Sequence, residues 1–201
     1  AINLANNNSL ANITALPSSI TGGAMTLLAT QTASGSANLS FTSGIDDTYD
    51  SYVFKFYNIH PATDNVQFLF NMSSDSGSNY NVTKTTTYFL AEHNATGGSA
   101  NLSYQSAKDL AQSTDFQKLM TDLGNAADEN LSGYLTIYNP SSTTFVKNFM
   151  SRTNAQAYSA TNISFDNYIA GYGNTTSAVD AIQFKMSSGT FDGVIKLYGV
   201  S

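Results

Sequence analysis

The sequence contains no cysteine and no tryptophan, and it is poor in charged residues. The absence of cysteine excludes disulfide bonds, thiolate metal sites and a cysteine nucleophile, and it agrees with folding in a reducing cytosol. Charged residues make up 11% of the chain, against about 25% in an average soluble protein. Serine, threonine, asparagine and glycine supply most of the polarity, and these residues suit strands and turns better than helix interiors.

Basic residues are too scarce for several classes of partner. There are 8 lysines and arginines against 14 acidic residues, which gives a net charge of −6. Such a chain cannot build the broad basic surface that nucleic acids require, and it has no polybasic cluster for anionic lipid. No run approaches the ~18 apolar residues of a membrane helix, and the first residues do not resemble a signal peptide. We therefore expect neither nucleic acid nor membrane as a partner.

Residues 1–24 differ in composition from the rest of the chain. They are rich in asparagine, low in charge, and end in a Gly22-Gly23 pair. A segment of this kind buries little apolar surface alone. We predict an extended N-terminal arm over residues 1–24, followed by one domain over residues 25–201. The partner-binding residues predicted in the arm are its isolated apolar positions, Ile2, Leu4, Leu10, Ile13, Leu16 and Ile20.

The remainder of the chain has a hydrophobic period of two, which indicates strands. Ile182, Phe184 and Met186 show it most clearly, because Gln183 and Lys185 lie between them. Residues 106–124 are the only helix-like window, and there we expect a short helical turn followed by a strand from Phe116. The predicted strands cover residues 25–31, 37–43, 52–59, 66–73, 83–93, 133–139, 143–152, 167–173, 181–187 and 194–200.

Many short strands separated by turn residues predict an all-β fold. Pro61, in the segment HPATDN, favours a turn between the strands 52–59 and 66–73. The most favoured architecture is an antiparallel β-sandwich of the jelly-roll type, and a barrel is the alternative.

Three aspartates, Asp46, Asp47 and Asp50, are the weak candidates for a metal site. Carboxylates on one loop could hold a hard cation such as calcium. The alternative, which we favour, is a loop in which aspartate side chains bond to their own backbone before a strand begins. Asp75, in the segment DSGSN, permits the same two interpretations, and there a hairpin turn is favoured.

The sequence offers no clear catalytic constellation. The two histidines, His60 and His93, lie in no recognised catalytic motif, and Glu92 and His93 would point to opposite faces of a strand. Asp128 and Glu129 are the nearest candidates for paired carboxylates, although a solvated loop is the favoured interpretation. We therefore predict no catalytic residue and no cofactor. Exposed tyrosines or phenylalanines could stack on sugar rings, but most aromatic rings are expected to fill the core.

Several segments carry a resemblance to a known group of proteins. They are SLANITALPSSI, FTSGIDDTYDSYVFKFYNIHPATDNVQFLF, YNPSSTTFVKNF and AGYGNTTSAVDAIQFKMSSGTFDGVIKLYGV. In these segments the chain resembles virion structural proteins of marine and cyanobacterial tailed phages. The resemblance implies a place in a particle, assembled in the bacterial host cytoplasm, and it implies no active-site residue.

The function expected from these observations is that of a non-enzymatic virion structural protein. A capsid decoration (cement) protein, anchored through the arm to other virion proteins, is the first hypothesis. The alternative is a tail or fibre component that binds host glycans, which requires a row of exposed tyrosines or phenylalanines beside asparagine and aspartate. A homo-oligomer is expected, and a trimer would match capsid or fibre symmetry. An enzyme would need two carboxylates that converge in a cleft.

Overall fold

The computed structural model describes residues 25–98, 100–158 and 162–201. These residues form twelve strands and no helix, and every strand pair is antiparallel, which confirms the all-β prediction. None of the described segments forms a helix able to cross a lipid bilayer. The strands are β1 (Thr26–Ser36), β2 (Asn38–Phe41), β3 (Ser51–Pro61), β4 (Val66–Ser73), β5 (Lys84–Asn94), β6 (Ala100–Tyr104), β7 (Gln117–Leu123), β8 (Leu131–Tyr138), β9 (Lys147–Ala157), β10 (Ile163–Gly173), β11 (Ala181–Met186) and β12 (Phe191–Val200).

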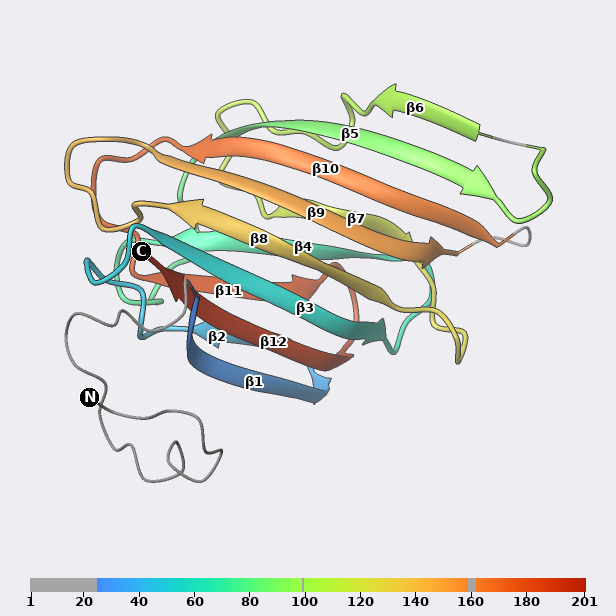
Figure 1. Ribbon diagram of the computed structural model, residues 1–201, viewed down its shortest axis with the longest axis horizontal. Helices are drawn as coiled ribbons and strands as arrows, with labels where there is room; N and C mark the ends of the chain where they lie inside the picture. Colours follow the sequence, from blue (N-terminus) through green and yellow to red (C-terminus); the bar gives the residue numbers. More distant parts are fainter. Residues whose placement is uncertain (1–24, 99, 159–161) are drawn as a thin grey trace, which may run out of the picture.

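All twelve strands belong to one hydrogen-bonded sheet that curls back on itself (Figure 1). Its path runs β1-β12-β3-β8-β9-β7-β4-β11-β2, and β10, β5 and β6 continue outward from β9. The two ends of the path, β1 and β2, are consecutive strands separated by Ala37 alone. The sheet therefore nearly closes, in the manner of a barrel.

This closure corrects the expected architecture. A sandwich has two separate sheets, whereas here β7 and β9 are paired at Leu123 and Ala157, which makes the hydrogen-bonded path continuous. The jelly-roll sandwich is not confirmed, and the structure has the barrel-like closure that was the alternative.

The core consists mainly of aromatic and aliphatic side chains that point into the curled sheet. The predicted inward residues Ile182, Phe184 and Met186 are all buried. Phe184 of β11 lies 5.3 Å from Phe54 and 5.2 Å from Phe56 of β3, measured between ring centroids. These tilted and edge-to-face ring contacts join β3 and β11, which are not neighbours along the path of the sheet.

Several predicted elements differ in detail. Residues 106–116 form turns and no helical turn, although the strand expected from Phe116 exists as β7. Pro61 is the last residue of β3, opposite Phe191, so the turn begins after it. The strand predicted at 143–152 begins later, at Lys147, and β6 was not predicted.

Two lysines are fully buried where β5 and β9 begin. Lys84 and Lys147 lie on either side of Gly173 in the strand register. The Lys84 ammonium donates to Asn71 Oδ1 (2.5 Å) and to the Val82 carbonyl (2.7 Å). Lys147 donates to the carbonyls of Ser142 and Phe145. Both ammonium groups thus fasten loop backbone to the sheet.

Candidate functional site: an exposed aromatic face

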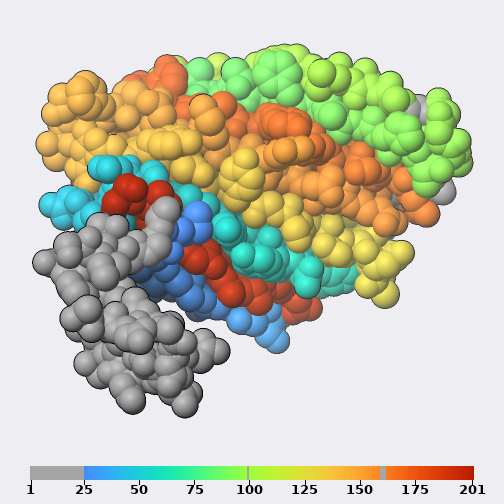
Figure 2. All heavy atoms as spheres, in the orientation of Figure 1, coloured from blue at the N-terminus to red at the C-terminus, as the bar shows by residue number. Residues whose placement is uncertain are grey.

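The outer face of eight neighbouring strands is the most distinctive surface of the protein. The strands are ordered β6-β5-β10-β9-β8-β3-β12-β1. Figure 2 shows most of them side by side as a broad, gently contoured surface. Residues that alternate with the core positions of these strands point outward here.

One row of directly opposed residues crosses this face from β6 to β12. In an antiparallel sheet, opposed residues place their side chains side by side on the same face. Strand register therefore brings together residues that lie far apart in the sequence. We call this set the cross-strand row, and it consists of Tyr104, Phe89, Tyr168, Arg152, Tyr134, Lys55 and Lys196.

The aromatic members of the cross-strand row are well exposed. Tyr104, Phe89, Tyr168 and Tyr134 expose 48%, 44%, 39% and 43% of their surface, respectively. Phe89 and Tyr104 pack edge to face, with ring centroids 5.3 Å apart. An outward sheet face is normally polar, so a run of exposed rings across adjacent strands makes this face the candidate interaction surface.

A fixed ion pair lies in the middle of the row. Arg152 Nε and Nη2 donate to the two Asp166 carboxylate oxygens, at 3.0 and 2.7 Å. The Tyr168 hydroxyl donates to Asp166 Oδ2 (3.0 Å), and the Arg152 guanidinium carbon lies 4.9 Å from the Tyr168 ring centroid. The hydrogen bonds from Arg152 hold the pKa of Asp166 below its ordinary value. The guanidinium is therefore oriented in advance, with other N–H groups left for a ligand.

Shallow hollows lie on both sides of Arg152. One, of about 280 Å³, is lined by Phe89, Tyr168, Met150 and Tyr134 among other residues. Another, of about 380 Å³, is lined by Tyr134, Asn154 and Asp166 with their neighbours. Apolar ring faces beside amide, carboxylate and hydroxyl groups can hold a ligand with apolar and hydrogen-bonding sides, as sugars have.

The three aspartates considered for a metal site belong to the loop between β2 and β3. Asp46 Oδ1 accepts hydrogen bonds from the Thr48 amide and the Tyr52 hydroxyl, both at 2.9 Å. These bonds, with the Thr48 amide first, lower the pKa of Asp46. The structure does not bring Asp46, Asp47 and Asp50 together as a metal-ligating group, and no such group of three or more residues occurs in the described ranges. Asp46 fastens the loop to β3.

Asp75 organises the turn after β4. Its carboxylate accepts hydrogen bonds from the Ser73 hydroxyl (2.6 Å) and from the amide and side chain of Asn79 (both 2.8 Å). These bonds, led by that from Ser73, lower the pKa of Asp75 to about 2. The contacts are those of a turn, but the predicted hairpin is wrong, because β4 pairs with β7 and β11 while β5 pairs with β6 and β10.

The remaining titratable candidates do not converge. His60 Nδ1 lies 2.6 Å from the Glu129 carbonyl oxygen, while the Glu129 carboxylate accepts from the Ala126 amide (2.9 Å). Glu129 is buried against Gly124, and Asp128 is exposed. His93 lies at the far end of β5, opposite Ser164. These side chains therefore form no common site.

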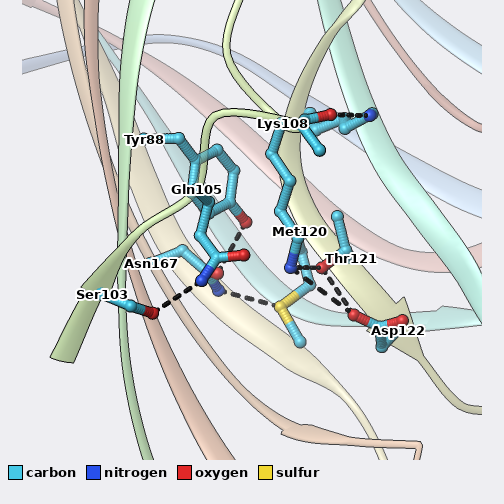
Figure 3. A network of polar contacts seen from close by, with 10 residues as sticks. Tyr88, Ser103, Gln105, Lys108, Met120, Thr121, Asp122 and Asn167 are labelled. Atoms are coloured by element: carbon cyan, nitrogen blue, oxygen red, sulfur yellow. Dashed lines mark hydrogen bonds and ion pairs between the residues drawn. The ribbon is translucent and has the colours of Figure 1, made fainter. Parts of the chain in front are cut away.

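A polar cluster underlies the inner face of β5 and β10 (Figure 3). Tyr88 donates to Asn167 Oδ1 (2.6 Å), and Lys108 donates to Thr121 Oγ1 (2.7 Å). The Lys108 ammonium also lies 3.7 Å from the Asp122 carboxylate. Burial raises the pKa of Tyr88. Among the described residues no buried side-chain polar atom lacks a partner, so we interpret the cluster as a brace between the loop before β7 and the sheet.

Sequence reasoning did not locate the cross-strand row. The residues that it did predict, in the arm, cannot be compared with the structure. Ile2, Leu4, Leu10, Ile13, Leu16 and Ile20 lie outside the described residues. The sequence did carry a signal for the row, namely tyrosines at the outward positions of predicted strands, such as Tyr134 in GYLTIYN and Tyr168 in NYIAGYG. Strand register was needed to join them.

Comparison of the chain with models of known protein families, with curated proteins and with solved structures finds no match.

Proposed function

We propose that the protein is a non-enzymatic structural protein of a bacteriophage particle, displayed on the capsid surface as a decoration protein. Residues 1–24 are its anchor, and their apolar side chains bury against a neighbouring virion protein. The segments that resemble virion proteins support this, because they include β3, β11, β12 and most of β4 of the central framework. Copies of the chain associate as a symmetric homo-oligomer, with a trimer matching capsid three-fold symmetry.

The order of the strands is the observation that carries the proposal. Four nested pairs, β1–β12, β2–β11, β3–β8 and β4–β7, are antiparallel. Nested pairing of this kind supports a jelly-roll winding, with β5–β6 and β9–β10 inserted between its strands. We propose that this winding underlies the barrel-like sheet. Jelly rolls form both viral capsid domains and lectin domains. Because one fold hosts many functions, the choice between these two depends on the exposed site.

Purified particles provide the test. The full chain, expressed during infection of the host, is expected in washed particles by mass spectrometry and on the capsid lattice by electron cryomicroscopy. A variant without residues 1–24 is expected to be absent, because the anchor is missing. Circular dichroism and thermal unfolding of this variant serve as the folding control. Absence of the full chain from particles would contradict the structural role, and normal incorporation of the truncated chain would contradict the anchor.

A second candidate function is favoured by the cross-strand row. In a tail or fibre component, Phe89, Tyr168 and Tyr134 would stack on host glycans beside Asp166 and Asn154. Their exposure and register give the row of rings that this function requires. Density at the tail, with the outer face turned away from the particle, would distinguish this function from decoration.

A further inference from the structure

Two lysines face each other where the cross-strand row reaches β3 and β12. Lys55 is directly opposite Lys196 in the strand register. Like charges in this position destabilise a sheet. The ion pairs among the described residues are Lys108–Asp122 and Arg152–Asp166, so neither Lys55 nor Lys196 has a carboxylate partner there. An anion bound above the two ammonium groups would relieve the repulsion between them.

The two lysines are held by a reciprocal arrangement of tyrosines. Lys55 Nζ lies 5.4 Å from the Tyr198 ring centroid, and Lys196 Nζ lies 5.5 Å from that of Tyr57. Each strand thus contributes a Lys-x-Tyr segment, and the antiparallel pairing relates the two by a local two-fold axis. Burial, followed by the neighbouring Tyr198 phenol, raises the pKa of Tyr57. The site therefore presents two ammonium groups beside the rings of Tyr57 and Tyr198.

The two lysines form one end of the cross-strand row, which also holds rings and the Arg152 guanidinium. Tyr134 separates Lys55 from Arg152, and Tyr168 and Phe89 follow on the other side of Arg152. With neighbouring strands about 4.8 Å apart, Arg152 and Lys55 are about 10 Å apart along the row. Three of the 8 basic residues of an acidic chain lie in this one line. The row therefore has two lysines without a carboxylate partner at one end. Beyond the Tyr134 ring follows Arg152, whose charge Asp166 balances and whose guanidinium keeps further N–H groups for a ligand.

We propose that the cross-strand row binds an acidic polysaccharide, lying across the strands. Its sugar rings stack on Tyr134, Tyr168 and Phe89, while carboxylate or sulfate groups pair with Lys55, Lys196 and Arg152. A neutral glycan would leave the opposed ammonium groups without a counter-charge. A second copy of the chain would have to bury Lys55 and Lys196 in an interface, where unpaired charges are costly.

This inference makes the second candidate function concrete, and it does not depend on the place of the chain in a particle. The test uses the full chain and calorimetric titration at low and raised salt. The probes are polygalacturonate for carboxylate, dextran sulfate for sulfate, unmodified dextran as the neutral polymer, and single-stranded DNA as an unrelated polyanion. Binding to one or both acidic polysaccharides is expected, with affinity falling as salt rises.

Variants separate the contributions of charge and ring. Lys55→Gln with Lys196→Gln is expected to lower the affinity about tenfold or more and to reduce its salt dependence, and Tyr134→Ala to lower it about tenfold. Lys185→Gln is the matched charge control. Lys185 belongs to β11, outside this face, and its ammonium group lies over the Phe116 ring. Phe145→Ala is the matched ring control, since Phe145 is exposed in the turn before β9. Both controls are expected to bind as the unchanged chain does.

Four results would overturn the site. They are no binding to either acidic polymer, equal binding to dextran, equal binding to single-stranded DNA, or equal losses in the two control variants. A row variant that dissociates an oligomer in sedimentation, without any polymer binding by the full chain, would identify the face as an interface between copies. Incorporation of the Lys55→Gln, Lys196→Gln chain into particles is measured separately, so failure of the glycan site remains distinct from failure of the structural role.

Discussion

At the scale of single residues, Lys84 shows how this lightly charged protein uses a buried cation. Its ammonium group is enclosed and donates to Asn71 and Val82. Burial lowers the pKa of Lys84 to about 7, and the charge of Asp115 only partly opposes this. An unfolded lysine has a pKa of about 10.4. Between these two values the unfolded chain binds a proton that the native protein does not.

Stability is therefore expected to rise with pH above neutrality. The free energy of unfolding should increase by about 1–2 kcal/mol between pH 7.5 and pH 9.5, because the unfolded state binds more protons in this window. Lys84→Met should flatten the increase, while Asn71 Oδ1 keeps the Met72 amide as a donor. Urea denaturation of both proteins at several pH values measures the effect. Lys108 and Lys147 have pKa values lowered by burial too, so part of the slope should remain. An identical slope in both proteins would refute the role of Lys84.

At the scale of elements, one side chain of β11 contacts rings from three other strands inside the curled sheet. The Phe184 ring is fully buried and packs against rings of β2, β3 and β4, namely Phe41, Phe54, Phe56, Phe68 and Phe70. No other strand in the described ranges places a ring against all three of these elements.

Removing this ring should be severe. Phe184→Ala is expected to lower the free energy of unfolding by about 3–5 kcal/mol, because a cavity forms where strands from both sides of the closure meet. Phe145→Ala, on an exposed turn, is the control and should change stability by no more than about 0.5 kcal/mol. Thermal and urea denaturation compare them. A loss for Phe184→Ala as small as that of the control would show that the closure does not depend on this cluster.

Strands in which apolar and polar residues alternate strictly could be predicted from the sequence. Elements that are stabilised by partners distant in the sequence could not. The residues around Phe184 alternate cleanly, so both the strand and its buried face are predictable. β6 has exposed side chains and exists because it pairs with β5, which its own composition does not indicate. Residues 106–116 carry a partial helical spacing, but their backbone bonds to β5 through Ser113 and Leu110 instead.

The candidate site illustrates the same limit more strongly. Tyr134, Arg152 and Lys55 come from three strands, and only the register places them in one row. The scarcity of basic residues argues against a large basic surface, yet it gives no sign that three cations share a line. Positions on a strand follow from local pattern, but register between distant strands is a tertiary property.

At the scale of the whole molecule, stability is expected to be unequally distributed. β3, β4 and β11 carry the aromatic core, whereas β6 has no buried residue and pairs with β5 alone. In native-state hydrogen exchange, amides of β3, β4 and β11 should exchange slowest, and those of β6 fastest among the strands, because local opening follows the density of buried contacts. Mass spectrometry of proteolytic fragments after deuterium labelling measures this order. Protection of β6 equal to that of β4 would contradict it.

The pairing of β1 with β12 determines how the protein would respond to mechanical load. Thr26 is opposite Gly199, so the first strand starts where the last one ends (Figure 1). A pulling force applied between a segment before Thr26 and one after Val200 would act across this end of the antiparallel pair. The hydrogen bonds between β1 and β12 would then break one after another, as in unzipping, and would not share the load as they do in shear. β1 would peel away at low force while the rings around Phe184 stay packed.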